Sequence, residues 1–200
     1  MAYTYFWRDF QTLHYIQKFA IPRIKSESHI DLWDAGCAMG PEPYSLAILL
    51  RENLDNATFE RVRLFATDID GEEDFEGTLK RAVYPMEQLE RIPETLREKY
   101  LSPTADPDQF EIRQDLKDCL IFQRHDLLTL KPLRHNFGLI MCKNVLLHFS
   151  PAQRVEVIKM FHSALAEGGF FVSEQTQKMP AEASHLFKQV VPNAQLYQKI

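Results

Sequence analysis

The chain has 200 residues, of which 45% are hydrophobic and 26% are charged, with a formal net charge of −5 at pH 7. This is the composition of a globular domain with a sizeable core, and the acidic balance with scattered basic residues argues against a nucleic-acid-binding surface. No apolar stretch is long enough to span a bilayer, and the N-terminus lacks the basic, then apolar, then small-residue segments of a signal peptide. The three cysteines, Cys37, Cys119 and Cys142, lie far apart in the sequence, which is typical of reduced thiols in a cytoplasmic protein rather than of a zinc site.

Helix-like and strand-like segments alternate along the chain. After an aromatic segment over 1–9, apolar spacing and terminal signals predict helices over 10–25, 43–53, 72–81 and 181–190, and one that starts at Ser150-Pro151 and ends at Gly168-Gly169. Short apolar segments predict strands over 30–35, 62–67, 120–123, 137–142, 170–174 and 195–200. The alternation predicts a three-layer α/β sandwich that forms one domain over residues 1–200.

The segment between the second and third strands is longer than a crossover connection requires. It covers about residues 84–122, and within it we expect a helix over 93–100 and a small hairpin formed by 110–114 and 116–122. The sequence therefore predicts a small antiparallel β-subdomain inserted into the sandwich.

A glycine-containing loop follows the first strand. Gly36 can take a positive φ and has no Cβ to block a ligand, Gly40 repeats this where the next helix starts, and Glu42 stands where a carboxylate can face cofactor hydroxyls. The chain contains neither G-x-G-x-x-G nor G-x-x-x-x-G-K-[ST], and an acidic residue in the loop would repel a phosphate. The loop favours a nucleotide-type cofactor that is not a polyphosphate, such as S-adenosylmethionine; the alternative is a plain tight turn.

An acidic residue ends the second strand, which is where ribose-binding carboxylates lie in doubly wound sheets. Asp68 can accept both hydroxyls of a ribose, because the second strand lies beside the first. Asp70 is the second candidate, with a turn before Gly71 as its alternative role.

Four segments, in order, resemble the catalytic domain of the CheR-type chemoreceptor glutamate methyltransferases. They are Thr4-Tyr5-Phe6-Trp7-Arg8-Asp9 (family T-x-F-F-R-D), Trp33-Asp34-Ala35-Gly36-Cys37 through Glu42-Pro43-Tyr44-Ser45 (W-x-A-x-C-S-T-G-E-E-P-Y-S), Ala66-Thr67-Asp68-Ile69-Asp70 (A-T-D-I-D) and Cys142-Lys143-Asn144-Val145-Leu146-Leu147-His148-Phe149 (C-R-N-V-L-I-Y-F). The resemblance implies a Rossmann-like class I methyltransferase fold, S-adenosylmethionine as cofactor, S-adenosylhomocysteine as product and a receptor glutamate as methyl acceptor.

The resemblance also implies roles for individual residues. The implied cofactor-binding residues are Thr4, Arg8, Ala35, Gly36, Glu42, Asp68, Asp126, Leu127, Asn144 and Val145, and the implied catalytic residues are Arg8, Asn144 and His148. Arg8 would hold the acceptor carboxylate by two parallel hydrogen bonds; its alternative is a surface arginine that covers Phe6 and Trp7. Thr4 would bond the cofactor's amino acid end, with a disordered terminus as its alternative. Asp126 would accept from the adenine amine while Leu127 packs on the ring, with a turn residue as the alternative for Asp126.

The chain departs from the family pattern at several points. Lys143 stands where the family usually has arginine, and His148 where it has a tyrosine near the methyl group; His148 can stack and donate a hydrogen bond, or it can be a packed residue. The loop over 102–108 lacks the glycine of members that dock a receptor peptide, so a lid or spacer is an equal alternative for the insert. The helical domain that precedes the N-terminal motif in full-length members is expected to be absent.

These observations lead to three hypotheses. The first is a protein-glutamate O-methyltransferase that acts on chemoreceptors or other chemosensory proteins as a monomer, in the cytoplasm and without membrane insertion. The second keeps methyl transfer but changes the acceptor to another protein or a small molecule, and the third is a non-catalytic S-adenosylmethionine-binding interaction module. A glutamate carboxylate is already ionised at neutral pH, so transfer needs no catalytic base and depends on bringing the reactants together in line.

Overall fold

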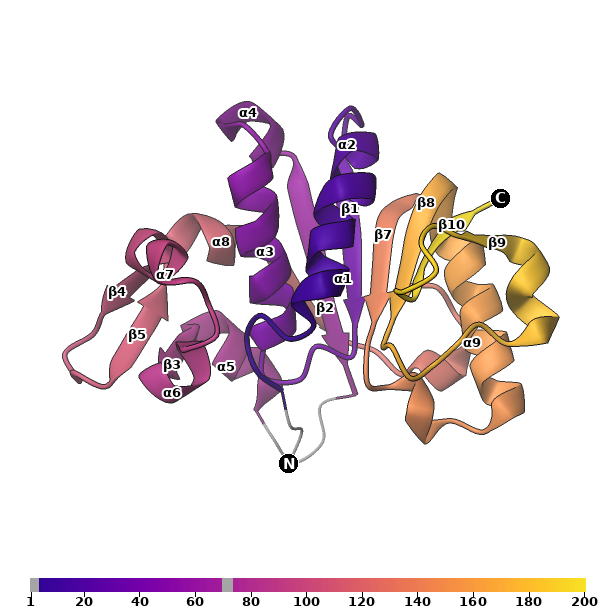
Figure 1. Cartoon of the computed structure of the whole chain (residues 1–200). Helices are drawn as coiled ribbons and strands as arrows, with labels where there is room; N and C mark the ends of the chain where they lie inside the picture. The colour runs from indigo at the N-terminus through magenta and orange to yellow at the C-terminus, as the bar shows by residue number, and fades with distance from the viewer. Residues whose placement is uncertain (1–3, 70–73) are drawn as a thin grey trace.

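The computed structural model of the protein describes residues 4–69 and 74–200 (Figure 1). Its main element is a seven-stranded sheet in the order β6-β2-β1-β7-β8-β10-β9. The strands are β1 (Ile30–Ala35), β2 (Val62–Asp68), β6 (Leu120–Arg124), β7 (Phe137–Cys142), β8 (Leu165–Ser173), β9 (Phe187–Gln189) and β10 (Leu196–Lys199). Neighbours from β6 to β8 pair in parallel, whereas β10 is antiparallel to both of its neighbours. The first four predicted strands are confirmed, and the last is confirmed as β10.

Helices cover both faces of this sheet, because successive residues of a strand point to opposite sides. In β1, Leu32 packs into the core on one side and Trp33 into the core on the other. The first side is covered by α1 (Phe10–Tyr15), η1 (Ile16–Ala20), α2 (Ile21–Ile24) and α3 (Pro41–Asn53), and the second by α9 (Pro151–Ala164) (Figure 1). The predicted three-layer α/β sandwich is confirmed.

The N-terminal helical segment is continuous, as predicted, but it is not α-helical throughout. Asp9 caps α1 by accepting from the backbone N–H of Thr12, and η1 is a π-helical turn that ends two residues before Pro22. Proline has no N–H to donate to the preceding turn, which accounts for an irregular ladder at this point. At α9, the predicted cap is confirmed: Ser150 and Gln153 form a capping box.

Two predictions for the C-terminal third were wrong. The helix α9 ends at Ala164, not at Gly168-Gly169, and the chain continues directly as β8, in which Gly168 has φ +70°. The glycines therefore belong to an irregular strand, with a register shift against β7, rather than to a helix end. The helix expected over 181–190 is the short turn η4 (Ala181–Leu186) followed by β9, since pairing with β10 extends the backbone from Phe187 on.

The insert is a three-stranded antiparallel sheet in the order β3-β5-β4. Its strands are β3 (Val83–Pro85), β4 (Leu101–Pro103) and β5 (Gln109–Ile112), and its helices are α6 (Met86–Leu89), α7 (Glu94–Tyr100) and α8 (Gln114–Asp118). The helix expected over 93–100 is confirmed as α7. The hairpin of 110–114 with 116–122 was wrong, because β5 pairs with β3 and β4 while residues 120–124 join the main sheet beside β2. The loop over 102–108 connects β4 to β5.

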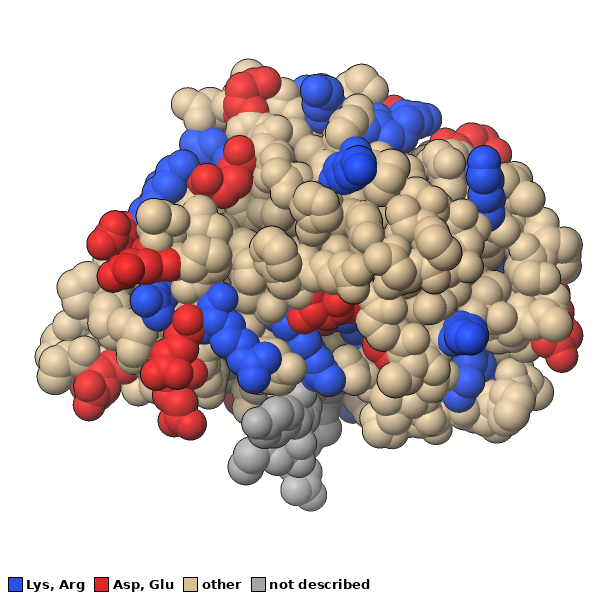
Figure 2. All heavy atoms as spheres, in the orientation of Figure 1, with Lys and Arg blue, Asp and Glu red and all other residues tan. Residues whose placement is uncertain are grey.

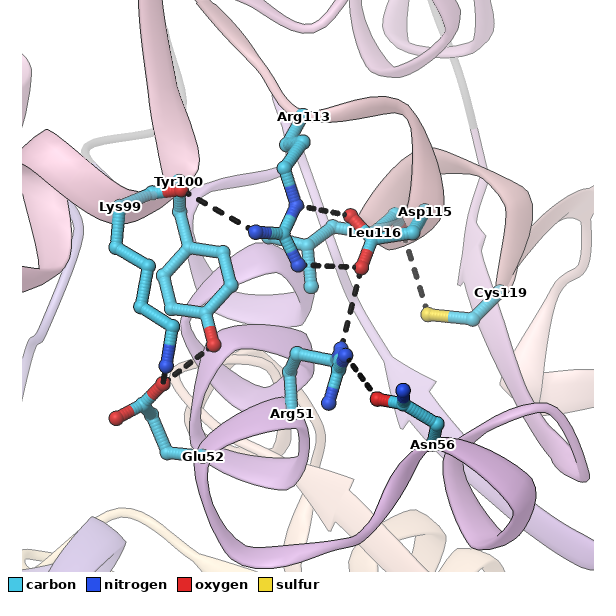
Figure 3. Close-up of polar contacts among 9 residues, drawn as sticks. All are labelled: Arg51, Glu52, Asn56, Lys99, Tyr100, Arg113, Asp115, Leu116 and Cys119. Carbon is cyan, nitrogen blue, oxygen red and sulfur yellow. Dashed lines mark hydrogen bonds and ion pairs between the residues drawn. The ribbon is translucent and has the colours of Figure 1, made fainter.

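Charged side chains fasten the insert to α3 (Figure 3). Glu52 of α3 accepts from Lys99 at 2.5 Å and from the hydroxyl of Tyr100. Asp115 accepts two bonds of 2.6 Å from Arg113 and one of 3.2 Å from Arg51 of α3. These partly exposed contacts form a network rather than isolated pairs, which is the arrangement in which surface ion pairs contribute measurably. The insert is thus tied to the helix whose first turn carries Glu42.

The strand order reverses at β1, with β2 on one side and β7 on the other. In open α/β sheets, such a point leaves a crevice at the carboxyl ends of the strands, where ligands bind. The remaining short helices are α4 (Asn56–Phe59), α5 (Phe75–Arg81), η2 (Leu127–Thr129) and η3 (Leu146–His148). On the face shown in Figure 2, basic and acidic side chains are interspersed. None of the described helices has the length and apolar character needed to cross a membrane.

Candidate functional site

A cavity of about 780 Å³ lies at the carboxyl ends of β1, β2, β6 and β7. It brings together residues that are far apart in the sequence, from the N-terminal segment to η3. All of the predicted site residues except Ala35 line it: Thr4, Arg8, Gly36, Glu42, Asp68, Asp126, Leu127, Asn144, Val145 and His148. Ala35 is fully buried at the end of β1, and Asp70 lies outside the described residues.

Gly36 has the conformation that the sequence predicted. Its φ is +107°, and the N–H groups of Gly36 and Cys37 donate to the carbonyl of Thr67 at 2.7 and 3.0 Å. A Cβ added to Gly36 would lie 2.1 Å from Cγ2 of Val145, which itself lines the cavity. Only glycine therefore fits where the loops after β1 and β7 approach each other.

Asp68 is held in a fixed orientation at the end of β2. One carboxylate oxygen accepts from the N–H of Ala38 at 2.9 Å, and the other accepts from the N–H of Ile69 at 2.8 Å. Each carboxylate oxygen can accept more than one hydrogen bond, so both retain capacity for a ligand hydroxyl. The backbone of the glycine loop thus orients this side chain without exhausting it.

Two buried carboxyl groups lie side by side near the glycine loop. Asp34 is fully buried, and among the described residues neither of its oxygens, nor Oε1 of Glu42, accepts from an N–H or hydroxyl group; a protonated Asp34 can donate to the Glu42 carboxylate. Burial raises the pKa of Asp34 well above its ordinary value, and the neighbouring Glu42 adds to the rise. Burial also raises the pKa of Glu42, against the opposing effect of Lys143. A pair of buried acids suits a cationic ligand group.

Asp34 and Glu174 were not among the predicted site residues, although both act on the charge of Glu42. Glu174 follows β8, is buried, and accepts from the N–H of Asn144 at 3.0 Å, where Asn144 has φ +61°. The signal for Asp34 was available, since it is a carboxylate inside the apolar strand Ile30–Ala35. The signal for Glu174 was not available locally, because its contact with Asn144 joins the ends of two different strands, β8 and β7.

The N-terminal segment is fixed against α3. The N–H of Trp7 donates to Oγ of Ser45 at 2.9 Å, and Ser45 in turn donates to the carbonyl of Pro41. The guanidinium group of Arg8 lies 5.2 Å from the ring centroid of Tyr5. Arg8 is thus carried into the cavity wall by a segment that packs on the first turns of α3.

The opposite wall of the cavity comes from the segments after β6 and β7. Asp126 accepts from the N–H of Leu128 at 2.9 Å and so caps η2, while Leu127 is buried. His148 is exposed in η3 and borders the cavity rather than packing into the core. Leu128 and Leu147, which are 40% and 41% exposed, add an apolar rim. The cavity therefore combines an apolar mouth with an acidic interior.

A second cavity, of about 420 Å³, lies at the opposite side of the sheet, by the amino ends of β1, β2 and β7. Its cationic groups are matched by acids: Arg63 donates two hydrogen bonds to Asp31, and Arg23 pairs with Glu27. None of the predicted site residues lies there. No group of three or more His, Cys, Asp or Glu side chains placed to hold a metal ion is found within residues 4–69 and 74–200.

The comparisons with known proteins agree with this geometry. A family model described as CheR methyltransferase, SAM binding domain, matches residues 2–195. A chemotaxis protein methyltransferase of Borreliella burgdorferi is 29% identical over 178 residues, which is 85% of this chain and 62% of that protein. A chemotaxis protein methyltransferase of Listeria innocua is 31% identical over 169 residues, which is 82% of this chain and 60% of that protein. The chain thus spans about 60% of the length of these relatives.

Among solved structures, the rRNA methyltransferase aviRa from Streptomyces viridochromogenes has a TM-score of 0.59 with this chain at 14% sequence identity. The match covers 98% of this chain and 86% of that protein. At this identity, the likeness concerns the fold alone: a Rossmann-like sheet that carries its ligand site at the carboxyl ends of the strands.

Proposed function

The chain belongs to the family of CheR methyltransferase SAM-binding domains, and on that basis we propose that it transfers a methyl group from S-adenosylmethionine to a glutamate carboxylate of a chemoreceptor. The observation that supports this most is the convergence of Arg8, Glu42 and Asp68 on one cavity from three separate segments. Two acids there suit a cofactor with a diol and cationic groups, and one arginine suits a carboxylate acceptor.

The residues present fit this cofactor. Asp68, oriented by two backbone N–H groups, would accept the ribose hydroxyls, and Leu127 would pack on the adenine while Asp126 accepts from its amine. Thr4 and Glu42 would hold the amino acid end: a buried carboxylate suits an ammonium group, whereas the hydroxyls expected for Glu42 from the sequence would bind Asp68. Gly36 and Val145, which pack against each other, would line one side of the cofactor.

When bound, S-adenosylmethionine supplies a methyl group already activated on a sulfonium. The protein's own contribution is to orient the acceptor and exclude water. Arg8 would hold the acceptor carboxylate by a bidentate contact, with Asn144 and His148 bordering the same space. Because the carboxylate is ionised at neutral pH, none of these residues has to remove a proton.

The test is methyl incorporation from labelled cofactor into chemoreceptor-rich membranes, compared with receptors in which the candidate glutamates are replaced by alanine. Arg8→Ala should reduce incorporation at least tenfold while S-adenosylhomocysteine affinity stays within about threefold, since lost acceptor orientation acts on transfer. Arg23→Ala, which removes a surface arginine at the opposite side of the sheet, is the matched control. If affinity fell in Arg8→Ala but transfer per bound cofactor did not, Arg8 would be a cofactor ligand instead.

His148 and Lys143 are the two residues that favour an alternative function. Both stand where the family pattern has another residue, and both line the cavity. Transfer to other proteins or to small carboxylates, with none to receptors, would favour a different acceptor. Tight cofactor binding without transfer to any acceptor would favour an interaction module.

A further inference from the structure

Lys143 is the only lysine or arginine that is buried among the described residues. Its side chain is 3% exposed, although lysines are almost never buried without a partner. It follows β7 directly, and its Nζ lies 3.5 Å from Oδ2 of Asp9 and 3.8 Å from Oε2 of Glu42. Lys143 thus contacts acidic side chains of both the N-terminal segment and α3, and it lines the cavity.

One partner of Lys143, Glu42, is a proposed cofactor contact, and the other, Asp9, is adjacent to the proposed acceptor contact Arg8. Asp9 is adjacent to Arg8 and is itself fixed, because it accepts from Oγ1 of Thr12 at 2.6 Å while holding a left-handed backbone with φ +59°. Glu42 lies in the first turn of α3, and only one of its two oxygens approaches Lys143. Its other oxygen, Oε1, is buried and accepts from no N–H or hydroxyl group among the described residues; the neighbouring acid Asp34 supplies no cation to balance it.

We infer that Lys143 is a positioning residue for the cofactor: it fixes the Glu42 carboxylate so that Oε1 receives the ammonium group of the cofactor's amino acid end, and it ties the N-terminal segment to the same point. This rests on the proposed function only through the cofactor, and not through the identity of the acceptor. Lys143 itself contacts Glu42 and Asp9 rather than the reacting atoms.

Buried acids around Glu42 need cations to balance their charge. The groups whose charges face Glu42 are Asp34 from β1, Lys143 after β7, Arg8 and Asp9 from the N-terminal segment, and Glu174 after β8; the thiols of Cys37 and Cys142 lie nearby and have pKa values raised by burial. Burial raises the pKa of Glu42, and Lys143 is the largest influence that lowers it. Without Lys143, Glu42 would take up a proton at higher pH and lose its attraction for an ammonium.

The test uses Lys143→Met, which keeps the length and apolar stem of the side chain but removes the charge, with Lys143→Arg as the conservative control. Affinity for S-adenosylhomocysteine is measured by calorimetry from pH 6 to pH 8 on the full chain, a range in which the ligand's own amino group stays protonated. The parent should vary little over this range. Lys143→Met should bind about tenfold or more weakly at pH 7 and recover as pH rises, because Glu42 then ionises without help. Lys143→Arg should restore the parent's profile.

A merely structural role would lower the unfolding temperature of Lys143→Met without changing the shape of its pH profile, and that result would overturn the inference. Should Lys143→Met fail to fold, Glu42→Gln provides an independent test, since it is close to isosteric and leaves Lys143 paired with Asp9. Affinity in Glu42→Gln should fall at least about tenfold at every pH. Parent-like binding by Glu42→Gln, or no binding by the parent, would also overturn the inference, whereas binding without methyl transfer would count against the proposed function alone.

Discussion

Asp68→Ala should weaken cofactor binding more than any other single change of a carboxylate at the cavity. The side chain is already oriented by the N–H groups of Ala38 and Ile69, at 2.9 and 2.8 Å, so little ordering cost remains when a ribose binds. Two charge-assisted hydrogen bonds to the diol, offset in part by desolvation of the carboxylate, correspond to about 2–4 kcal/mol. That range is about a 30- to 900-fold increase in Kd.

The assay is a calorimetric titration with S-adenosylhomocysteine of the parent, Asp68→Ala and Asp68→Asn. The Asn variant keeps one carbonyl acceptor, so its loss should fall between those of the parent and the Ala variant. Asp108→Ala removes an exposed acid from the loop of the insert and serves as the control for a change in net charge. A Kd within twofold of the parent for Asp68→Ala would refute the reasoning and move the ribose site elsewhere.

Three further changes test how the site is built. Gly36→Ala should cost about 1–3 kcal/mol of unfolding free energy, because Gly36 has φ +107° and an added Cβ would lie 2.1 Å from Val145. Gly168→Ala is the control and should cost less, since Gly168 has φ +70° and the nearest atom to an added Cβ is 3.6 Å away. Equal losses of unfolding temperature in the two variants would contradict this. Asp34→Asn should stabilise increasingly as pH rises. Burial raises the folded-state pKa of Asp34, so the stability that its neutral form contributes is present below the unfolded-state pKa near 4 and is lost as pH rises through the folded-state pKa. The unfolding temperature of the variant should therefore be about 2–4 °C above that of the parent at pH 8 but not at pH 4. A difference that is constant with pH would count against this reasoning. Asp115→Ala removes three hydrogen bonds from guanidinium groups and should lower the unfolding free energy by about 1 kcal/mol. Proteolysis of the insert should become faster, while the affinity for S-adenosylhomocysteine should not change. Equal or slower cleavage would show that this network does not hold the insert on α3.

Local patterns determined much of the fold. The strand over 30–35 was predicted with its observed bounds, and the capping signal at Ser150 was correct because a cap depends on residues within one turn. The glycine loop was readable for the same reason: the positive φ of Gly36 belongs to the turn that its own neighbours make. Placing Asp68 beside that loop needed only the rule that adjacent parallel strands end at one edge of the sheet.

Where a segment pairs with a distant partner, the sequence was insufficient. The pattern over 110–122 alternates like a hairpin, yet residues 109–112 pair with β3 and β4 while 120–124 join β2, and nothing local distinguishes those partners. Residues 187–189 form a strand rather than the end of a helix because β10 offers them hydrogen bonds. Tertiary context decided the type of structure in both cases.

The chemistry of the site divides in the same way. The sequence by itself determined which residue types were present: a glycine loop, carboxylates at strand ends and an arginine in the N-terminal motif. Only the tertiary structure brought Lys143 within 4 Å of both Asp9 and Glu42, and buried Asp34 beside Glu42. Burial and charge pairing depend on distances between segments that are remote in the chain, so the tertiary structure sets where protons and charges reside in this cavity.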